Sequence, residues 1–436
     1  MPEGSFKRIS VIGLGYIGLP TAAMFASRKI EVVGVDVNQH AVDTINQGEV
    51  HIVEPDLDMV VRAVVREGYL RATTVPEPAD GFLIAVPTPF KGDQHDPDLS
   101  YIRAAALAIA PVLKAGNLVI LESTSPVGAT ESMANWLAEA RPDLSFPQDA
   151  GEASDIRVAH CPERVLPGKV MQELITNDRV IGGMTAICSA HAAALYKTFV
   201  TGDCVVASGP RVAEMAKLTE NSFRDVNIAF ANELSLICDH LGMDVWELIT
   251  LSNRHPRVNI LQPGPGVGGH CIAVDPWFIV SSAPDQAQLI RTAREVNDGK
   301  PKWVVEQVLS AITEHLKSNS GQTAADVSLA IYGLAFKPDI DDLRESPALA
   351  IAKALASCHP GEVLVVEPNI SELDLQDGTN MTLVGYEKAM QRANIHVVLV
   401  DHTPFKAATP PSGTIIDTKG IWNCKNENSL EQQQEK

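Results

Sequence analysis

The chain has fewer basic than acidic residues, and it lacks a long hydrophobic run. Its 35 Lys and Arg against 54 Asp and Glu give a formal net charge of −19. This charge argues against binding nucleic acid or an anionic membrane through a broad basic face, although a nucleotide ligand needs only a few local cations. No apolar run approaches the roughly 18 residues of a membrane span, and the N-terminal apolar stretch does not read as a signal peptide. We therefore expect a cytoplasmic protein.

Paired-cysteine motifs are also absent. The seven cysteines are an odd number, without a C-x-x-C pair and without a His/Cys cluster of metal-ligand spacing. Disulfide frameworks and structural zinc sites both depend on such patterns. We therefore expect reduced thiols and no metal.

A dinucleotide fingerprint is present near the N-terminus. An expected strand at 8–12 is followed by a G-x-G-x-x-G run formed by Gly13, Gly15 and Gly18, which opens an expected helix. The glycines permit a tight turn, close approach of the backbone to a pyrophosphate, and close packing of helix on strand. A second strand ends in Asp36, whose carboxylate can bind an adenosine ribose and repels a 2′-phosphate. The pattern predicts NAD; the alternative is a glycine-tolerant turn in another α/β protein.

Strand and helix patterns divide the 436 residues into three regions. Short β-branched runs alternate with amphipathic stretches as far as about residue 207, which is typical of a doubly wound parallel sheet. A long helical segment follows, and another strand near 327 opens a smaller lobe. We expect two Rossmann-like doubly wound α/β lobes, 1–208 and 319–436, joined by a central long-helix dimerisation region, 209–318. The polar tail from Lys425 is expected to be disordered.

Polar side chains in two places are candidates for a site. Thr88 and Thr124 follow expected strands of the parallel sheet, where they can face a cofactor or be ordinary turn residues. Lys217, Asn221 and Arg224 share one face of the long helix. Spacing alone favours a solvated stripe for these three over a polar site facing a cleft.

Cys271 lies in a glycine-rich run, PGPGVGGHCIAVD, at 263–275. A cysteine is usually a small buried hydrophobe, but a thiol in such a loop, far downstream of a dinucleotide fingerprint, indicates covalent redox chemistry. A thiolate adds to an aldehyde, so an alcohol oxidised once can be held as a thiohemiacetal, oxidised again to a thioester, and hydrolysed to a carboxylate. The hypothesis is a four-electron oxidation in one site.

The third region opens with GLAFKP at 333–338 and RESP at 344–347, whose cations Lys337 and Arg344 suit phosphate groups. With these residues in place, the chain resembles the UDP-glucose/GDP-mannose dehydrogenase family over nearly its whole length. The resemblance rests on motifs that occur in order: the fingerprint with Tyr16 and Ile17, STSPVG at 123–128, PERVLPG at 162–168, and the segments 213–233, 266–275 and 333–347. It implies an NAD domain, a helical dimerisation region and a UDP-sugar domain, with two NAD consumed as a sugar C6 alcohol becomes a uronate.

The resemblance also implies roles for the candidate catalytic residues. Cys271 looks like the nucleophile, Lys217 like the lysine of proton transfer or oxyanion stabilisation, and Asn221 like its hydrogen-bonding companion. This favours a site over a solvated stripe on the long helix. The family places two acidic residues near the thiol, which match Asp275 and Glu163. A hydroxyl that helps to position water matches Thr124.

Two further sets are carried over by position. The cofactor set consists of Gly13, Gly15, Tyr16, Ile17, Gly18, Asp36, Thr88, Thr124 and Arg344. The nucleotide-sugar set consists of Arg164, Val165, Lys217, Asn221, Arg224, His255, Arg257, Gly268, Phe336 and Lys337. The resemblance implies that His255 and Arg257 reach across a homodimer, although His255 could simply cap a turn.

Departures from the better-known UDP-glucose enzymes indicate the substrate. His270 precedes the cysteine, Val274 replaces a lysine, and Pro167 stands where a second glutamate is usual. These variants resemble the N-acetylhexosamine branch, so the implied substrate is UDP-N-acetyl-D-mannosamine, oxidised for surface polysaccharide synthesis. The alternatives are a 6-dehydrogenase of UDP-glucose or UDP-N-acetylglucosamine, and a catalytically silent nucleotide-sugar binding protein. The candidate catalytic set counts against the silent protein.

Overall fold

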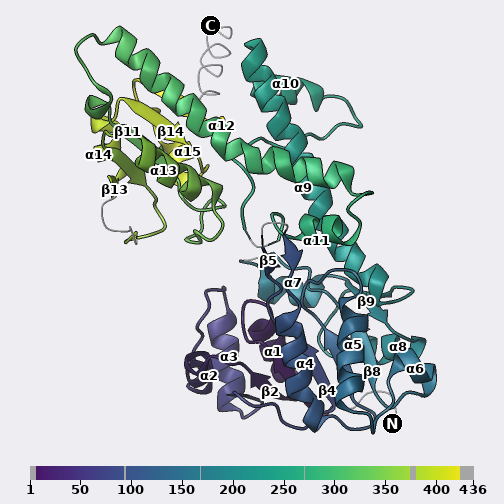
Figure 1. Ribbon diagram of the computed structural model, residues 1–436. Coiled ribbons are helices and arrows are strands. Elements are labelled where there is room, and N and C mark those ends of the chain that lie inside the picture. Colours follow the sequence, from purple (N-terminus) through teal and green to yellow (C-terminus); the bar gives the residue numbers. More distant parts are fainter. Residues whose placement is uncertain (1–5, 93–94, 167, 270, 374–379, 423–436) are drawn as a thin grey trace, which may run out of the picture. The chain divides into compact units, whose positions relative to one another are not determined.

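Two compact units make up the chain in the computed structural model (Figure 1). The model describes residues 6–92, 95–166, 168–269, 271–373 and 380–422. The units are Met1–Glu220 with Trp277–Pro284, and Asn221–Pro276 with Asp285–Lys436. His270, Pro167 and the tail from Lys425 lie outside the described residues. The predicted α/β class is confirmed, whereas domain boundaries at 208 and 318 stay a prediction.

An eight-stranded sheet organises the first unit, in the order β10-β9-β8-β7-β4-β1-β2-β3. The strands are β1 Arg8–Ile12, β2 Glu31–Val35, β3 Leu70–Thr73, β4 Gly81–Ile84, β7 Leu118–Leu121, β8 Arg157–His160, β9 Arg179–Gly183 and β10 Cys204–Val206. Pairing is parallel except between β8 and β9, so the last two strands run against the other six. The sheet therefore differs at this edge from the all-parallel one expected. A short hairpin, β5 Phe90–Lys91 with β6 Asp96–Pro97, follows β4.

Helices cover both faces of this sheet, which is why its strands read as nearly continuous apolar runs. Alternate side chains enter opposite cores: Val11 packs on one face and Val33 on the other. The first core includes residues of α1, α3, α7 and α8, and the second includes residues of α4 and α5. The helices are α1 Gly18–Ser27, α2 Gln39–Asn46, α3 Leu57–Arg66, α4 Ser100–Ile109, η1 Ala110–Val112, α5 Ala129–Ala140, α6 Pro147–Ala150, η2 Gly151–Ala153, α7 Val170–Thr176 and α8 Ala186–Tyr196.

A smaller parallel sheet organises the second unit, in the order β13-β12-β11-β14-β15. Its strands are β11 Leu329–Tyr332, β12 Val363–Val366, β13 Met381–Leu383, β14 Ile395–Val398 and β15 Thr414–Asp417, and α13 Pro347–Cys358, α14 Tyr386–Arg392, α15 Thr403–Ala407 and η3 Ala324–Asp326 accompany them. One core joins the sheet to α12 and α13, and the other joins it to α14, α15 and Trp422. The predicted second doubly wound lobe is thus confirmed.

Long helices dominate the middle of the chain. The predicted long helix is α9 Pro210–Leu241, with 32 residues, followed by α10 Val245–Ser252, α11 Asp275–Ser282 and the 31-residue α12 Gln288–Ser318. Residues 210–220 of α9 belong to the first unit and 221–241 to the second. Among the described residues, we find no helix with the length and apolarity needed to cross a membrane.

The two sheets open with the same backbone turn. The Gly13 N–H donates to Val35 O at 2.8 Å in the first unit, and the Gly333 N–H donates to Val366 O at 2.9 Å in the second. Both glycines have positive φ, 90° and 91°. An added Cβ would lie 2.7 Å or 2.3 Å from the nearest neighbouring atom, so both positions require glycine. The third region therefore repeats the fingerprint turn of the first.

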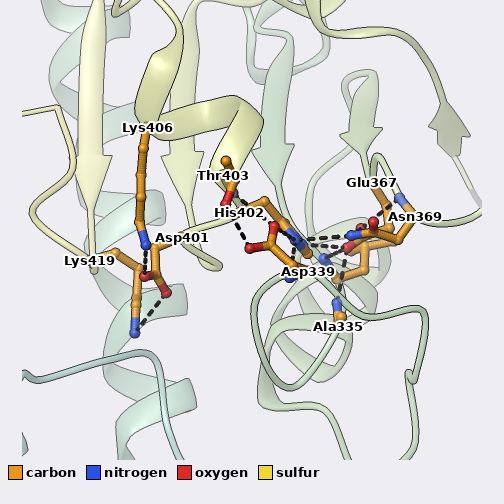
Figure 2. A network of polar contacts seen from close by, with 10 residues as sticks. Ala335, Asp339, Glu367, Asn369, Asp401, His402, Thr403, Lys406 and Lys419 are labelled. Atoms are coloured by element: carbon orange, nitrogen blue, oxygen red, sulfur yellow. Dashed lines mark hydrogen bonds and ion pairs between the residues drawn. The ribbon is translucent and has the colours of Figure 1, made fainter. Parts of the chain in front are cut away.

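A buried polar network fixes this turn in the second unit (Figure 2). The carboxylate of Glu367 accepts the N–H groups of Leu334 at 2.8 Å and Ala335 at 3.1 Å. The Asp339 N–H donates to His402 Nδ1 at 2.9 Å, which leaves Nε2 of this imidazole to donate to Glu367 at 3.0 Å. Burial alone would raise the pKa of Glu367, but the donors from His402 and the backbone outweigh it and lower the pKa.

The network predicts a large effect on stability. We expect His402→Ala to lower the free energy of unfolding by about 3 kcal/mol, because it leaves a buried carboxylate short of a donor. Chemical denaturation would measure the change, with Lys388→Ala on the exposed face of α14 as the control. Equal stability of the two variants would show that His402 does not brace the turn.

Candidate active site

The fingerprint turn presents open backbone beside an acidic side chain. Gly15 is exposed, and an added Cβ there would meet nothing within 4 Å, whereas one at Gly18 would lie 1.8 Å from Gly13 O. The half-buried Asp36 accepts the Leu14 N–H at 2.8 Å, which holds its carboxylate at the end of β2. These features fit a dinucleotide, with space for a pyrophosphate at the turn and an acceptor for a ribose.

Two candidate hydroxyls follow adjacent strands at the carboxyl edge of the same sheet. Thr88 follows β4 and Thr124 follows β7, and the Ser123 hydroxyl ties the two loops together by donating to Val86 O at 2.7 Å. Thr88 Oγ1 is buried and has no hydrogen-bond partner within the described part of the chain. A buried hydroxyl in this state is a natural partner for a ligand.

The start of α9 is bound to the loop that carries Thr124. The Glu214 carboxylate accepts the N–H groups of Gly128 at 2.7 Å and Thr130 at 2.8 Å, at the N-terminal end of α5. Burial raises the pKa of Glu214, although these donors oppose the rise. Lys217 lies about one turn further along α9 and is half-buried. The cap therefore sets the position of Lys217 relative to Thr124.

Glu163 lies just beyond β8, at the same edge of the sheet, and is 6% exposed. Its Oε1 accepts the Arg164 N–H at 2.6 Å, and its Oε2 accepts Arg179 Nη1 at 2.6 Å. The Arg164 guanidinium binds Glu220 of α9 at 2.7 Å. The neighbouring Val165 packs against the sheet core. The first unit thus gathers Thr88, Thr124, Glu163, Arg164 and Lys217 around its carboxyl edge.

The second unit contains the candidate nucleophile. Cys271 is exposed, and its carbonyl oxygen accepts the Asp275 N–H at 2.9 Å, so the cysteine stands one helical turn before α11. Asp275 is 2% exposed and accepts Asn221 Nδ2 of α9 at 2.5 Å. Two residues singled out by sequence as separate motifs are therefore in direct contact. Arg224, from the same predicted stripe, is exposed.

The other end of the cysteine loop is also bound to α9. The Gly264 N–H donates to Asn232 Oδ1 at 2.9 Å, and Asn232 Nδ2 donates to Asn297 of α12 at 2.8 Å. Asn297 and Arg294 in turn bind Asp225 at 2.8 and 2.7 Å. All four side chains of this network are at most 1% exposed. Roughly three helical turns separate Asn232 from the other contact of α9 with the loop, so both contacts come from one face of the helix.

Between these contacts the loop packs on the first strand-to-helix connection of the second sheet. An added Cβ at Gly268 would lie 2.4 Å from Glu345 O and 3.0 Å from Phe336 Cβ. Gly269 has a φ of 82° and faces the Phe336 ring. The substrate candidates Gly268, Phe336 and Lys337 are therefore neighbours. The loop needs its glycines because a side chain would collide with this connection.

Remaining candidates occupy exposed turns. His255 and Arg257 follow α10, and the Arg257 N–H donates to His255 Nδ1 at 3.3 Å, so this histidine does cap its own turn. The Arg344 guanidinium binds Asp342 at 2.6 Å within its own loop. Tyr16 is 42% exposed and Ile17 precedes α1.

The described residues contain no group of three or more His, Cys, Asp or Glu side chains that could hold a metal ion.

Sequence reasoning missed a small hollow at the carboxyl edge of the second sheet. Its lining includes Gly266, Phe336, Asp401 and Lys419. The strand order reverses between β11 and β14, which is where such sheets bind ligands. Lys419 Nζ lies 3.4 Å from Asp401, which also binds Lys406 at 2.6 Å (Figure 2). The strand-end rule that singled out Thr88 would also have identified Asp401.

Comparisons with known proteins cover all three regions. Family models for the UDP-glucose/GDP-mannose dehydrogenase family match residues 7–200 (NAD binding domain), 211–299 (central domain) and 330–424 (UDP binding domain). The chain is 67% identical to a UDP-N-acetyl-D-mannosamine dehydrogenase of Yersinia pestis, over 96% of this chain and 100% of the relative. It is 63% identical to an NDP-N-acetyl-D-galactosaminuronic acid dehydrogenase of Ralstonia nicotianae, over 96% and 97%. A solved UDP-D-ManNAc dehydrogenase of Pyrococcus horikoshii is 38% identical, with a TM-score of 0.83 and coverage of 95% and 96%.

The double attachment of the cysteine loop to α9 gives a testable prediction. We expect Asn232→Ala to speed amide hydrogen exchange at 263–269 and to lower the free energy of unfolding by about 2 kcal/mol, because the Gly264 N–H loses its acceptor. Asn227→Ala is the matched control, since this asparagine donates only to its own helix, at Phe223 O, among the contacts found. Unchanged exchange in the loop would contradict the attachment.

Proposed function

Because the chain belongs to the UDP-glucose/GDP-mannose dehydrogenase family and uses NAD, we propose that it oxidises the C6 alcohol of UDP-N-acetyl-D-mannosamine to the uronate. The observation that carries the proposal is the exposed Cys271 on a glycine-rich loop held to α9 at both ends. The Yersinia relative named for this sugar, at 67% identity, supports the choice of substrate.

The proposed chemistry uses Cys271 to hold the carbon at two oxidation levels. The thiolate adds to the C6 aldehyde and forms a thiohemiacetal; its oxidation gives a thioester, and water releases the carboxylate and regenerates the thiol. Overall, one alcohol, one water and two NAD⁺ give one carboxylate, two NADH and three protons. NAD supplies hydride acceptance in both oxidations, and Gly13, Gly15, Asp36 and Thr88 are the residues that would hold it.

The neighbouring side chains have roles that follow from their charge and contacts. Lys217 and Asn221 stabilise negative charge on the substrate oxygen. The hydrogen bond to Asp275 fixes the plane of the Asn221 amide, which keeps its other polar groups oriented. Glu163 and Thr124 direct water at the thioester.

The nucleotide sugar is assigned to cations and backbone of several segments. Gly268, Phe336 and Lys337 are neighbours in the second unit, which supports their common role. The hollow containing Lys419 adds a cation for the nucleotide. The other residues proposed to bind the nucleotide sugar are Arg164, Val165, Arg224, His255 and Arg257. Arg344, Tyr16 and Ile17 are proposed to bind the cofactor.

We further propose a homodimer that works in the cytoplasm and supplies surface polysaccharide synthesis. Large apolar side chains are exposed on α9 and α10, including Phe223 at 69% and Leu251 at 62%. A face of this kind in a soluble enzyme commonly marks a protein interface. His255 and Arg257, on the turn after α10, would then reach the partner's substrate.

The second candidate function is oxidation of a different acetamido sugar nucleotide. The Ralstonia relative, at 63% identity, is named for N-acetyl-D-galactosaminuronic acid, so the acetamido group is better supported than the epimer. Steady-state rates with UDP-N-acetylmannosamine, UDP-N-acetylgalactosamine, UDP-N-acetylglucosamine and UDP-glucose would decide. A preference for UDP-glucose would overturn the assignment to the acetamido branch.

Stoichiometry tests the four-electron reaction. With UDP-N-acetylmannosamine and excess NAD, we expect two NADH per sugar consumed and a carboxylate product, because the aldehyde is held on the thiol until its second oxidation. Absorbance would count NADH, and mass spectrometry would identify the product. One NADH with a released aldehyde would reduce the activity to a simple alcohol oxidation.

The cysteine is tested by a matched pair of variants. Cys271→Ala should lower uronate formation by more than about a thousandfold, because a covalent step is lost, while UDP binding by calorimetry stays within about twofold. Cys358→Ala, which removes another exposed thiol, is the control. Normal turnover by Cys271→Ala would exclude the thioester mechanism.

A further inference from the structure

A cluster of buried ionisable groups surrounds Glu163, and the functions proposed above assign no role to it. Arg179, at the start of β9, is 2% exposed and donates to Glu163 Oε2 at 2.6 Å. The same nitrogen lies 3.9 Å from Oε1 of Glu122, which follows β7 and is 1% exposed. One guanidinium therefore faces two carboxyl groups, only one of which it binds closely.

Two aromatic side chains also contact the cluster. The Arg179 guanidinium stacks over the Tyr196 ring at 5.0 Å and lies 5.9 Å from the Phe199 ring. Tyr196 donates its hydroxyl to Glu122 Oε1 at 3.0 Å. Glu122 Oε2 has no hydrogen-bond partner among the described residues. This oxygen lacks the donors that a buried carboxylate needs, so it suits a protonated acid.

The charges follow from burial and from the neighbours. Burial, and then the charge of Glu163, raise the pKa of Glu122 to about 8, against the opposing effects of Arg179 and of the Tyr196 and Thr21 hydroxyls. Burial also raises the pKa of the Cys161 thiol and of Tyr196. For Arg179, burial alone would lower the pKa, but Glu163 and its other neighbours raise it. At neutral pH the cluster thus holds the Arg179 cation beside neutral Glu122, Cys161 and Tyr196.

Two hydrogen bonds hold the Glu163 carboxylate in one orientation. Its two oxygens accept from different elements, Oε1 from the Arg164 N–H and Oε2 from Arg179, each at 2.6 Å. A carboxylate has about four lone-pair directions, so each oxygen keeps one for another donor such as water. The two fixed hydrogen bonds determine where those remaining directions point.

We propose that Arg179 is the positioning residue that holds the Glu163 carboxylate oriented for thioester hydrolysis, and that Glu122 is its neutral companion, whose ionisation would draw Arg179 away. This inference rests on the function proposed for Glu163. It adds two residues that are at most 2% exposed. It also ties the hydrolytic step to the protonation of a buried acid on the neighbouring strand.

The first test separates acylation from hydrolysis. Arg179→Lys keeps the charge but loses the guanidinium fork, so we expect a burst of two NADH per site at the wild-type rate, followed by turnover slowed at least tenfold. Mass spectrometry should find the acyl group on Cys271, and KM for the sugar nucleotide should stay within about twofold. Glu163→Gln should behave in the same way.

The second test uses the pH profile of Glu122→Gln, whose amide has the shape of the neutral acid. Wild-type turnover should fall as Glu122 ionises above its pKa of about 8, so the ratio of variant to wild-type kcat should rise about tenfold between pH 7 and pH 9. Glu139→Gln, on the exposed end of α5, is the control and should keep a constant ratio.

The pH dependence of protein stability tests whether Glu122 is neutral. The folded pKa of Glu122 lies above the ordinary carboxyl value, so its stabilising contribution is full at acidic pH and is lost as pH rises from about 5 through 8. In thermal unfolding, the stability of Glu122→Gln relative to the wild type should therefore increase across that pH range. A constant difference would mean that Glu122 is ionised throughout, which overturns its role as neutral companion.

The outcomes distinguish this inference from the function on which it rests. Wild-type turnover by Glu163→Gln would remove the role of Glu163 and with it the inference. Slow hydrolysis in Glu163→Gln together with wild-type turnover in Arg179→Lys would overturn the inference and leave the function standing. If Arg179→Lys does not fold, the Glu122→Gln profile decides: a flat ratio overturns the proposal, and a rising ratio supports it.

Discussion

Hydrogen bonds between buried side chains of α9 and neighbouring segments are the interactions on which the candidate site depends. In the first unit Glu214 binds the N-terminal end of α5, next to the loop of Thr124. In the second unit Asn232 binds the Gly264 N–H, and Asn221 binds Asp275. Within each unit, the side chains of α9 give the bound loop a reference point that its own backbone does not supply. The proposed chemistry is carried by these loops.

The two sheets show how one backbone turn is used in different ways. Asp36 and Glu367 follow the second strand of their sheets, and each accepts the N–H group after the turn glycine at 2.8 Å. Asp36 is half-buried and keeps acceptor capacity toward solvent, whereas Glu367 is 5% exposed and is bound by His402. A ligand hydroxyl can therefore reach the first carboxylate more readily than the second. The same turn thus presents an open acceptor in one sheet and a covered one in the other.

Sequence predicted the features that depend on local spacing. Strand and helix alternation, the long helix and the fingerprint turn all have short-range periods, and the structure has them. The reversed direction of β9 and β10 was missed, because periodicity carries no information on strand direction. The helix stripe shows the limit for the site: Asn221 is buried against Asp275 while Arg224 is exposed. Asn232, Arg179 and Glu122 were missed because their partners are distant in sequence, and an isolated Asn, Arg or Glu gives no local signal.

Two buried glutamates illustrate why position alone does not assign a charge. Glu122 and Glu367 both follow a strand that is paired in parallel on both sides, and both are almost fully buried. Glu367 receives two backbone N–H groups and His402, and its pKa is lowered. Glu122 receives no backbone N–H among the contacts found and lies near the carboxyl group of Glu163, and its pKa rises to about 8. Glu122 is the more deeply buried of the two, and the charge of Glu163 adds to the penalty on its charged form, so these effects outweigh its donors. At Glu367 the donors outweigh burial. Glu367 can therefore act as a permanent brace, and Glu122 remains able to change its charge near neutral pH.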